Sequence, residues 1–365
     1  MTLTEELLAP RAFEPATVIQ PHRSVRVGVF GLGRCGLHHA ATLSTITNVD
    51  LVAIGDPDRA ARRNARGMGL PARSYASAGT MLQRATPEVV FVATPFDLAA
   101  GLAAQALDAG SAVMIEGVPA LAAADAAPLI HAAAHAERSI ACALALAYHP
   151  VFEAARRIVA SDTLGVVRQV RASRNVSRVV TQAHQRSYSA HGGPRGVMAH
   201  LGAELMFVLV RMFGMPGAVT ATSQRLYGAL DDEARGGWTL AGGARLGFET
   251  SWSAPGYPRS ATVIEVEAEF GRMLLSEDAV EIDLAVVRGA FPAGATRFGP
   301  ASLPQSARFE LDGDELWLQD ATFLAAVTGG AATPTELSGC LDSLRVVDAL
   351  YASAAADGAA VDVAR

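Results

Sequence analysis

The chain has 365 residues, of which 50% are hydrophobic and 18% are charged. This ordinary globular composition excludes a mainly disordered, collagen-like or fibrous protein. A formal charge of −6 at pH 7 argues against a protein whose whole surface binds nucleic acid. The length predicts two domains, each large enough to bury a core of its own.

Every one of the 30 basic residues counted as Lys or Arg is arginine. Schiff-base chemistry and a P-loop lysine are therefore excluded. The guanidinium group stays protonated at ordinary pH, so arginine binds and orients anions but is a poor proton shuttle. Proton transfer must fall to His, Glu, Asp, Tyr, Cys or water.

The three cysteines, Cys35, Cys142 and Cys340, are far apart and form no CxxC motif. This spacing is typical of a reducing compartment without a disulfide framework. The first nine residues lack a basic start and an apolar core, so we expect no signal peptide. The uncharged stretch 139–152 is shorter than the ~20 residues that a spanning helix needs. We expect a cytoplasmic protein without membrane contact.

Residues 1–24 contain three prolines and no clear periodicity, and are expected to be an N-terminal extension. From residue 25 to residue 148, short apolar runs alternate with longer alanine-rich stretches. We expect strands at residues 25–30, 51–55, 89–93, 112–115 and 140–146. We expect helices at residues 36–43, 59–66, 98–109 and 123–136. This alternation predicts an α/β domain with a doubly wound parallel sheet covered on both faces.

The pattern changes near Tyr148, so we expect a second domain over residues 149–365. Helices are expected at residues 150–160, 197–213, 316–327 and 335–355. Strands are expected at residues 166–172, 218–226, 246–252, 262–270 and 280–287. Residues 262–270 alternate valine with glutamate, which is typical of a sheet with one wet face. The second domain is therefore expected to be α+β, with an open, mostly antiparallel sheet.

A GxGxxG motif follows the first expected strand directly, at Gly31, Gly33 and Gly36. The first glycine permits a tight turn, the second lets the backbone approach a pyrophosphate, and the third lets the helix pack on the strand. The helix N-terminus adds amide donors for phosphate charge. The alternative is a glycine turn that only allows a helix to pack. Cys35, at the start of the helix, could have a lowered thiol pKa, or it could pack under the loop.

Asp56 lies 20 residues after Gly36, at the end of the second expected strand. A carboxylate at this position can accept hydrogen bonds from the ribose hydroxyls of an adenosine, so the βαβ unit predicts a dinucleotide site. The charge of Asp56 favours NAD over NADP. Arg59, Arg62 and Arg63 lie close by, and one of them could hold the 2′-phosphate of NADP.

With these motifs in place, residues 25–355 resemble the glucose–fructose oxidoreductase and inositol dehydrogenase family, Gfo/Idh/MocA. The likeness is carried by Gly-Leu-Gly-Arg-Cys-Gly-Leu-His-His-Ala at 31–40, Gly-Asp-Pro-Asp at 55–58 and Val-Ala-Thr-Pro-Phe-Asp-Leu at 92–98. Asp-Ala-Gly at 108–110 and the helix at 196–213 with its closing Gly214 fit as well.

The resemblance implies a Rossmann domain followed by an α/β domain whose open sheet forms a homo-oligomer interface. It also implies hydride transfer between a nicotinamide and a carbon atom, commonly one that bears a sugar hydroxyl. The residues implied to bind the cofactor are Gly31, Leu32, Gly33, Arg34, Cys35, Gly36, Asp56, Thr94, Pro95 and Glu116.

The positions of the family's proton donors are changed in this chain. The usual Glu-Lys-Pro appears as Glu116-Gly117-Val118-Pro119, and the usual Asp-x-Gly-x-His appears as residues 200–204, His-Leu-Gly-Ala-Glu. The histidine that often follows the Thr-Pro turn is also absent, with Ala99 near that place. His200 and Glu204 are four residues apart on a helix and share one face. We expect His200 to be a general acid or base oriented by Glu204, with Glu116 lining the cleft. The alternative is a structural or solvated pair.

The spacing of His200 and Glu204 would also suit a metal, with His184 or His191 as a third ligand, but nothing in the spacing demands one. We expect no metal. Tyr148 and His149 are candidates for the substrate cleft, or packing residues at a hinge. Eight arginines against one acid between residues 156 and 195 suggest an anionic substrate, or a solvated strand face. Arg186 and Arg195, which lead into the His200 helix, are the substrate-binding candidates among them.

Three functions follow from this pattern. The first is an NAD(P)-dependent oxidoreductase with a non-standard proton donor, which acts on a small polar metabolite that could be anionic. The second is a catalytically silent dinucleotide-binding sensor or partner subunit. The third is a redox-neutral lyase or hydrolase that uses bound NAD transiently. The first is favoured because titratable groups remain where the reaction would occur.

Overall fold

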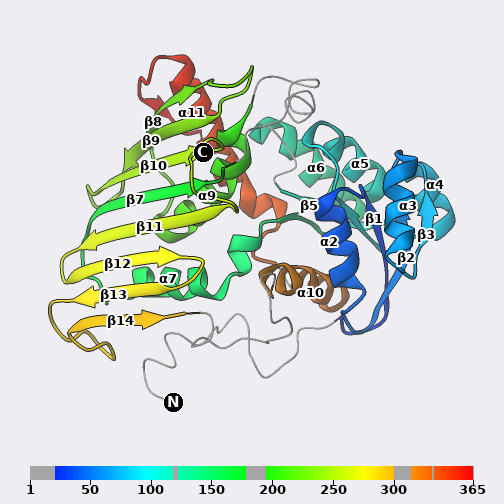
Figure 1. Ribbon diagram of the computed structural model, residues 1–365, viewed down its shortest axis with the longest axis horizontal. Coiled ribbons are helices and arrows are strands. Elements are labelled where there is room, and N and C mark those ends of the chain that lie inside the picture. The colour runs from blue at the N-terminus through cyan, green and yellow to red at the C-terminus, as the bar shows by residue number, and fades with distance from the viewer. Residues whose placement is uncertain (1–20, 118–121, 178–194, 300–313, 331–332, 365) are drawn as a thin grey trace. The chain divides into compact units, whose positions relative to one another are not determined.

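The computed structural model of the chain describes residues 21–117, 122–177, 195–299, 314–330 and 333–364 (Figure 1). These residues form two compact units. The first unit takes in the chain up to Ala145 and a later stretch that ends at Leu341, and the second takes in the chain from Leu146 and again from Asp342. Within the described ranges, no helix combines the length and the apolar character needed to cross a bilayer.

A six-stranded sheet is the centre of the first unit. Its strand order is β3-β2-β1-β4-β5-β6, and every neighbouring pair is parallel. The strands are β1 (Val25–Phe30), β2 (Val49–Gly55), β3 (Arg73–Tyr75), β4 (Val89–Val92), β5 (Ala112–Glu116) and β6 (Ile140–Ala143). The helices are α2 (Arg34–Leu43), α3 (Arg59–Gly67), α4 (Ala78–Ala85), α5 (Phe96–Asp108) and α6 (Ala123–Ala136). The predicted doubly wound α/β fold is confirmed, and its strand order reverses between β1 and β4.

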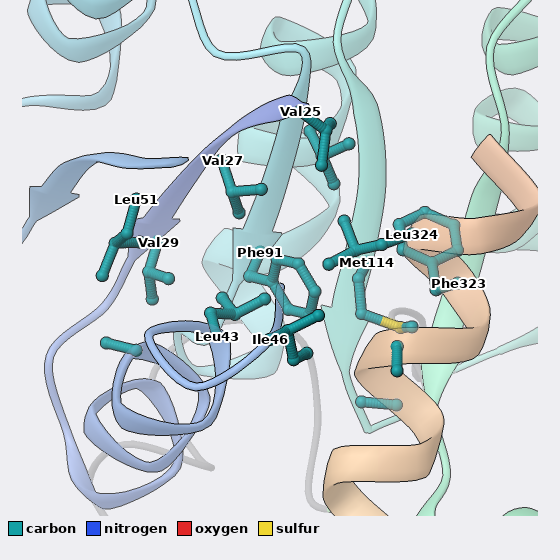
Figure 2. Packing of buried hydrophobic residues seen from close by; sticks show 14 of the residues in the cluster. Val25, Val27, Val29, Leu43, Ile46, Leu51, Phe91, Met114, Phe323 and Leu324 are labelled. Carbon is teal, nitrogen blue, oxygen red and sulfur yellow. The ribbon is translucent and has the colours of Figure 1, made fainter. Parts of the chain in front are cut away.

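The core of the first unit includes a helix from late in the chain. Helix α10 (Asp314–Gly329) contributes Trp317, Phe323 and Leu324 to the buried cluster that contains the β1 valines. Figure 2 shows Phe323 and Leu324 on this helix beside Met114 of β5. The predicted second domain, 149–365, therefore differs from the structure over residues 314–341. The physical reason is that the apolar side chains of α10 are buried against the first sheet and α2.

A nine-stranded sheet forms the centre of the second unit, in the order β14-β13-β12-β11-β7-β10-β9-β8-β15. Only β7 and β10 pair in parallel, so the predicted mostly antiparallel sheet is confirmed. The strands are β7 (Val167–Asn175), β8 (Ala218–Gln224), β9 (Glu233–Thr239), β10 (Arg245–Ser251), β11 (Ala261–Ala268), β12 (Gly271–Ser276), β13 (Val280–Leu284), β14 (Gly294–Phe298) and β15 (Val361–Asp362).

Helices cover one face of this second sheet, and among the described residues no helix covers the other, which we call the open face. Helices α7 (Pro150–Ala160) and α9 (Val197–Phe213) lie across the covered face (Figure 1), and α11 (Leu337–Ala355) ends the helical part of the chain. A short 3-10 helix, Ala145–Tyr148, precedes α7. Ile264 and Val266 of β11 are buried while Glu265 is exposed, as the alternation in the sequence predicts. The sequence pattern therefore fixes which face of β11 meets the helices.

The sequence analysis does not predict six of the elements: β3, α4, β9, β12, β14 and β15. β9 contains Gly236 and Gly237, which lower the intrinsic preference for a strand. It forms because β8 and β10 pair with it on both sides. A Cβ atom on Gly236 would overlap the carbonyl oxygen of Thr220, so the close pairing requires glycine there.

Asp231 anchors the start of α9, the helix that carries His200 and Glu204. It is 2% exposed, and its two carboxylate oxygens accept hydrogen bonds from Gly196 N at 2.6 Å and Met198 N at 2.9 Å. The Tyr351 hydroxyl of α11 donates to the same carboxylate at 3.0 Å. Burial raises the pKa of Asp231, and these donors oppose the rise by favouring the carboxylate. The first turn of α9 is therefore held to α11 through one buried acid.

We predict that Asp231→Ala lowers the free energy of unfolding by about 2 kcal/mol, because buried amide donors of α9 and the Tyr351 hydroxyl lose a charged acceptor. Urea denaturation followed by circular dichroism measures the change. Asp278→Ala is the control: this carboxylate is 77% exposed, with an arginine nitrogen no closer than 3.9 Å, and its loss should change stability by under about 0.5 kcal/mol. Equal effects of the two substitutions would contradict the anchor.

Candidate dinucleotide site

The glycine motif forms the turn from β1 into α2 at the point where three strand ends meet. Gly31 has a φ angle of +98°, and a Cβ atom on it would overlap the carbonyl group of Ala93 at the end of β4. A Cβ atom on Gly36 would overlap the carbonyl oxygen of Gly31. Position 31 therefore needs glycine for its backbone angle and its close approach, and position 36 needs it for its close approach alone.

Gly33 differs from its two neighbours, because a Cβ atom there would meet nothing within 4 Å. Its φ of −69° and ψ of −173° are open to any residue. It is the N-cap of α2, and no side chain caps the first turn of that helix. The fold does not require glycine at this position. Open space in front of a helix N-terminus is what a pyrophosphate needs.

Asp56 holds the glycine turn from the end of β2. Its Oδ2 accepts a hydrogen bond from Leu32 N at 2.8 Å, and its Oδ1 accepts one from Asp58 N at 2.7 Å. The carboxylate thus lies against the turn, as a ribose ligand should. Arg62 donates to the carbonyl oxygens of Asp56 and Pro57 at 2.5 and 2.8 Å. Arg59 and Arg63 are exposed, which leaves them as the candidates for a 2′-phosphate.

Thr94 and Pro95 continue from β4 next to Gly31. Pro95 is the N-cap residue of α5, and the Thr94 backbone nitrogen would lie 3.0 Å from a Cβ atom on Gly31. The Thr94 hydroxyl is buried and has no hydrogen-bond partner among the described residues. A buried hydroxyl without a partner costs free energy unless a ligand or water satisfies it. The open space at Gly33 and this hydroxyl both fit a bound dinucleotide.

Glu116, at the end of β5, belongs to a line of three charged groups. Its Oε2 lies 2.8 Å from Nε2 of His39, whose Nδ1 lies 2.9 Å from Oδ2 of Asp320. Burial alone would lower the pKa of His39, but the charges of Asp320 and Glu116 outweigh burial and raise it to about 10. Burial raises the pKa of Asp320, partly offset by His39. The two acidic neighbours therefore favour the imidazolium form of His39 at neutral pH.

Sequence reasoning did not single out His39 or Asp320. His39 is part of the His-His-Ala segment that carries the family resemblance, and it faces the core because it lies three residues after the buried Gly36 on α2. That helical spacing is the only sequence signal for its burial. Asp320 carries no such signal, because the pairing depends on the docking of α10.

The Cys35 thiol lies close enough to the Glu116 carboxylate for its negative charge to affect the pKa of the thiol. The residue as a whole is exposed, yet desolvation of the thiol and the negative charge of Glu116 raise its pKa to about 12. The lowered thiol pKa that was one of the two possibilities for Cys35 is therefore not found, because desolvation and the charge of Glu116 both raise it. Arg34, also exposed, lies close enough to oppose the rise.

His200 and Glu204 lie on α9 in the second unit. The Glu204 carboxylate is bound by Arg174 of β7, at 2.6 Å, and by the backbone nitrogen of Leu146 at 3.2 Å. Arg174 is 8% exposed and also contacts Thr262 and Glu277. The His200 ring packs edge-on against Trp252, with ring centroids 5.8 Å apart. The expected orientation of His200 by Glu204 stays a prediction, since the contacts described for Glu204 are with Arg174 and Leu146.

The substrate-binding candidates lie in the second unit or outside the described residues. Tyr148 is 1% exposed, which does not favour substrate contact, and His149 packs on Phe152 at 5.6 Å. Arg195 pairs with Asp348 at 2.6 Å and lies over the Tyr351 ring. Arg186, and the possible metal ligands His184 and His191, lie outside the described residues. Within the described ranges, no three acidic, histidine or cysteine side chains gather as a metal site would require.

Most arginines of the basic segment pair with acids of the same unit. Arg156 and Arg157 bind Glu153, and Arg171 lies on the open face of the sheet with Glu265 and Glu267. Together with the pairs made by Arg174 and Arg195, these contacts support the interpretation of the segment as a strand face with paired charges. Because these arginines are already paired with acids, the contacts do not favour a cluster of arginines that binds an anion.

Comparison with known proteins supports the interpretation of both units. Residues 25–143 match the model of an oxidoreductase family with an NAD-binding Rossmann fold, and residues 152–272 match the model of the GFO/IDH/MocA C-terminal domain. The rhizopine catabolism protein MocA of Rhizobium meliloti is 34% identical over 86 residues, which are 22% of this chain. The match spans 26%, about a quarter, of that relative's length.

Solved structures match over nearly the whole chain. GenD2 from gentamicin A biosynthesis, in complex with NAD, is 26% identical with a TM-score of 0.77, over 94% of this chain and 97% of that one. Levoglucosan dehydrogenase, in complex with NADH and levoglucosan, has a TM-score of 0.81 at 17% identity, over 94% of this chain and 100% of that one. With matches to both family domains and the dinucleotide site described above, the chain belongs to the Gfo/Idh/MocA family of NAD-binding oxidoreductases.

Proposed function

We propose that the protein is an NAD-dependent dehydrogenase that oxidises a secondary alcohol of a small polyhydroxylated metabolite, or reduces the corresponding ketone. The observation that carries this proposal is the glycine turn held by Asp56, with open space at Gly33 where the fold itself does not require glycine. The bound dinucleotide supplies the hydride acceptor or donor. The substrate class rests on levoglucosan dehydrogenase and GenD2, which both share this fold.

For the proton of the reacting hydroxyl we propose His200. It lies in the first turn of α9, which Asp231 anchors to α11 and which the Glu204–Arg174 ion pair ties to β7. An imidazole is the side chain best matched to proton transfer near neutral pH. In a chain without lysine, it is the group that we assign to the donor role.

We also propose that a second copy of the chain binds the open face of the nine-stranded sheet. That face is hollowed over the middle strands and lined by Arg171, Arg235, Glu249 and Glu265. Charges of both signs on one surface can pair with their counterparts across a two-fold axis. The exposed Leu274 of β12, 41% exposed, adds apolar area beside these charges.

The cofactor part of the proposal is tested by Gly33→Val. The side chain enters space that is open in the protein, so the melting temperature without cofactor should change by less than about 2 °C. It should fill the approach to the pyrophosphate, so we expect NADH to bind at least about 30-fold more weakly by isothermal titration calorimetry. Gly101→Val, also in open space, is the control and should bind NADH as the wild type does. Unchanged NADH binding by Gly33→Val would contradict the assignment.

Cofactor choice is tested by Asp56→Asn, which removes the negative charge and keeps a hydrogen-bond acceptor. We expect NADH affinity to fall about tenfold while NADPH affinity holds or rises, because the repulsion of a 2′-phosphate is lost. The ratio of the two dissociation constants is the measured quantity. A ratio equal to that of the wild type would show that Asp56 does not select the cofactor.

The catalytic part is tested by His200→Gln, assayed at 340 nm against a panel of sugars, anhydrosugars and cyclitols. On any substrate that the wild type turns over, we expect kcat to fall by about 10²- to 10⁴-fold with NADH affinity unchanged. His131→Gln, at an exposed histidine of α6, should leave kcat unchanged. Full turnover by His200→Gln would refute the proposed proton donor.

A further inference from the structure

Glu116 is the only member of the Asp320–His39–Glu116 line that reaches the surface. Its side chain is 32% exposed, whereas those of His39 and Asp320 are 2% and 0% exposed. The line therefore begins in the core of the first unit and ends at the carboxyl edge of the parallel sheet. A buried ionic group of this kind is costly unless each member is paired.

The buried end of the line is fixed by packing. The His39 ring contacts Phe91 with ring centroids 5.1 Å apart, and Phe91 meets Phe323 of α10 edge-on at 6.3 Å. Gln319 donates to the second oxygen of Asp320 at 3.3 Å. The imidazolium thus has neighbours on its face and at both nitrogens. It presents Nε2–H to Glu116 in one direction.

The exposed end of the line lies at a defined place in the ligand crevice. In a doubly wound sheet, a dinucleotide spans the crevice outside the carboxyl ends of the strands, with one nucleotide over each half. Asp56, at the end of β2, marks the adenosine half. Glu116 ends β5, in the opposite half, and lies close enough to Cys35 of the glycine turn for its charge to raise the pKa of that thiol.

We propose that His39 is a positioning residue for the nicotinamide half of the dinucleotide site: anchored on Asp320, it holds the Glu116 carboxylate at the end of β5, where that carboxylate accepts hydrogen bonds from the nicotinamide nucleoside. This inference rests on the proposed function. The nucleoside offers ribose hydroxyl and carboxamide N–H donors, and a carboxylate provides only acceptors. Because Gly117 follows Glu116, no lysine at the next position can supply the charge that fixes this carboxylate, and His39 supplies it from the core.

The test compares two ligands that share the adenosine half. NADH carries the nicotinamide nucleoside, and ADP-ribose carries only a ribose in its place. For His39→Gln we expect the dissociation constant of NADH to rise about tenfold and that of ADP-ribose to change by less than twofold, measured by calorimetry. His38→Gln, at the exposed neighbouring histidine, is the matched control and should change neither constant.

A second variant covers the case in which His39→Gln does not fold. Glu116→Gln removes the charge at the partly exposed end of the line and leaves His39 and Asp320 in place. It should show the same selective loss of NADH affinity. In the wild type without ligand, NMR should give the two ring nitrogens of His39 the chemical shifts of a doubly protonated imidazole from pH 6 to pH 8.5. Glu116, Asp320 and Cys35 are the titratable groups that face this ring or its partner carboxylate.

The outcomes separate this inference from the proposed function. If the wild type binds neither ligand, both fall. If the wild type binds NADH but the variants weaken both ligands equally, or weaken neither, the cofactor site stands and the positioning role of His39 is refuted. A His39 ring that titrates near its ordinary pKa would also overturn the inference, because the imidazolium would then not be fixed between the two acids.

Discussion

The parallel pairing of β1 with both β2 and β4 is the constraint on which the rest of the site depends. This pairing brings the ends of three strands to one place, where Gly31 turns against Ala93 and the Leu32 amide binds Asp56. Each strand end contributes one feature: β1 the turn, β2 the Asp56 carboxylate that we propose as the ribose ligand, and β4 the Thr94 hydroxyl. The strand order reverses between β1 and β4, which is where a doubly wound sheet binds its ligand. The meeting of these strand ends is therefore a consequence of topology, and the glycines adapt the backbone to it.

The chain has no lysine, so arginine and histidine are the side chains that pair with its acids. Where a flexible ammonium could have neutralised an acid, the structure uses a buried imidazolium between Asp320 and Glu116, and a buried guanidinium between Glu204 and Glu277. Packing holds both cations in position, so the positions of the carboxylates that they bind are restricted as well. In the first unit, His39 thus binds the Glu116 carboxylate at the end of β5. In the second unit, Arg174 binds the Glu204 carboxylate on α9, and the proposed function uses both elements.

The sequence was sufficient for features that depend on neighbours along the chain. The GxGxxG motif, the position of Asp56 and the alternating valine and glutamate of β11 are local patterns, and they predicted the turn, its acid and the wet face of the second sheet. The line from Glu116 to Asp320 could not be predicted in the same way, because His39 and Asp320 are 281 residues apart. Their pairing exists only because α10 returns to the first unit and packs on α2.

At two places, tertiary contacts outweighed the local preference of the sequence. β9 has two adjacent glycines and little apolar sequence, yet the strands on either side complete it. Glu204 shares a helix face with His200, but the contacts described for its carboxylate are with Arg174 from a neighbouring strand and with a backbone amide. For β9 the two strands next to it in the sequence outweigh the local preference, whereas Glu204 binds a partner 30 residues away that helix spacing alone could not reveal.

An equilibrium titration of the purified chain with NADH, followed by the fluorescence of the bound nicotinamide, tests the central claim most directly. The account predicts saturable binding at one NADH per chain, reversed by added NAD. It also predicts that ADP-ribose competes, because it occupies the glycine turn and Asp56. The absence of saturable binding would contradict the account, since the glycine turn would then serve only the packing of α2 on β1.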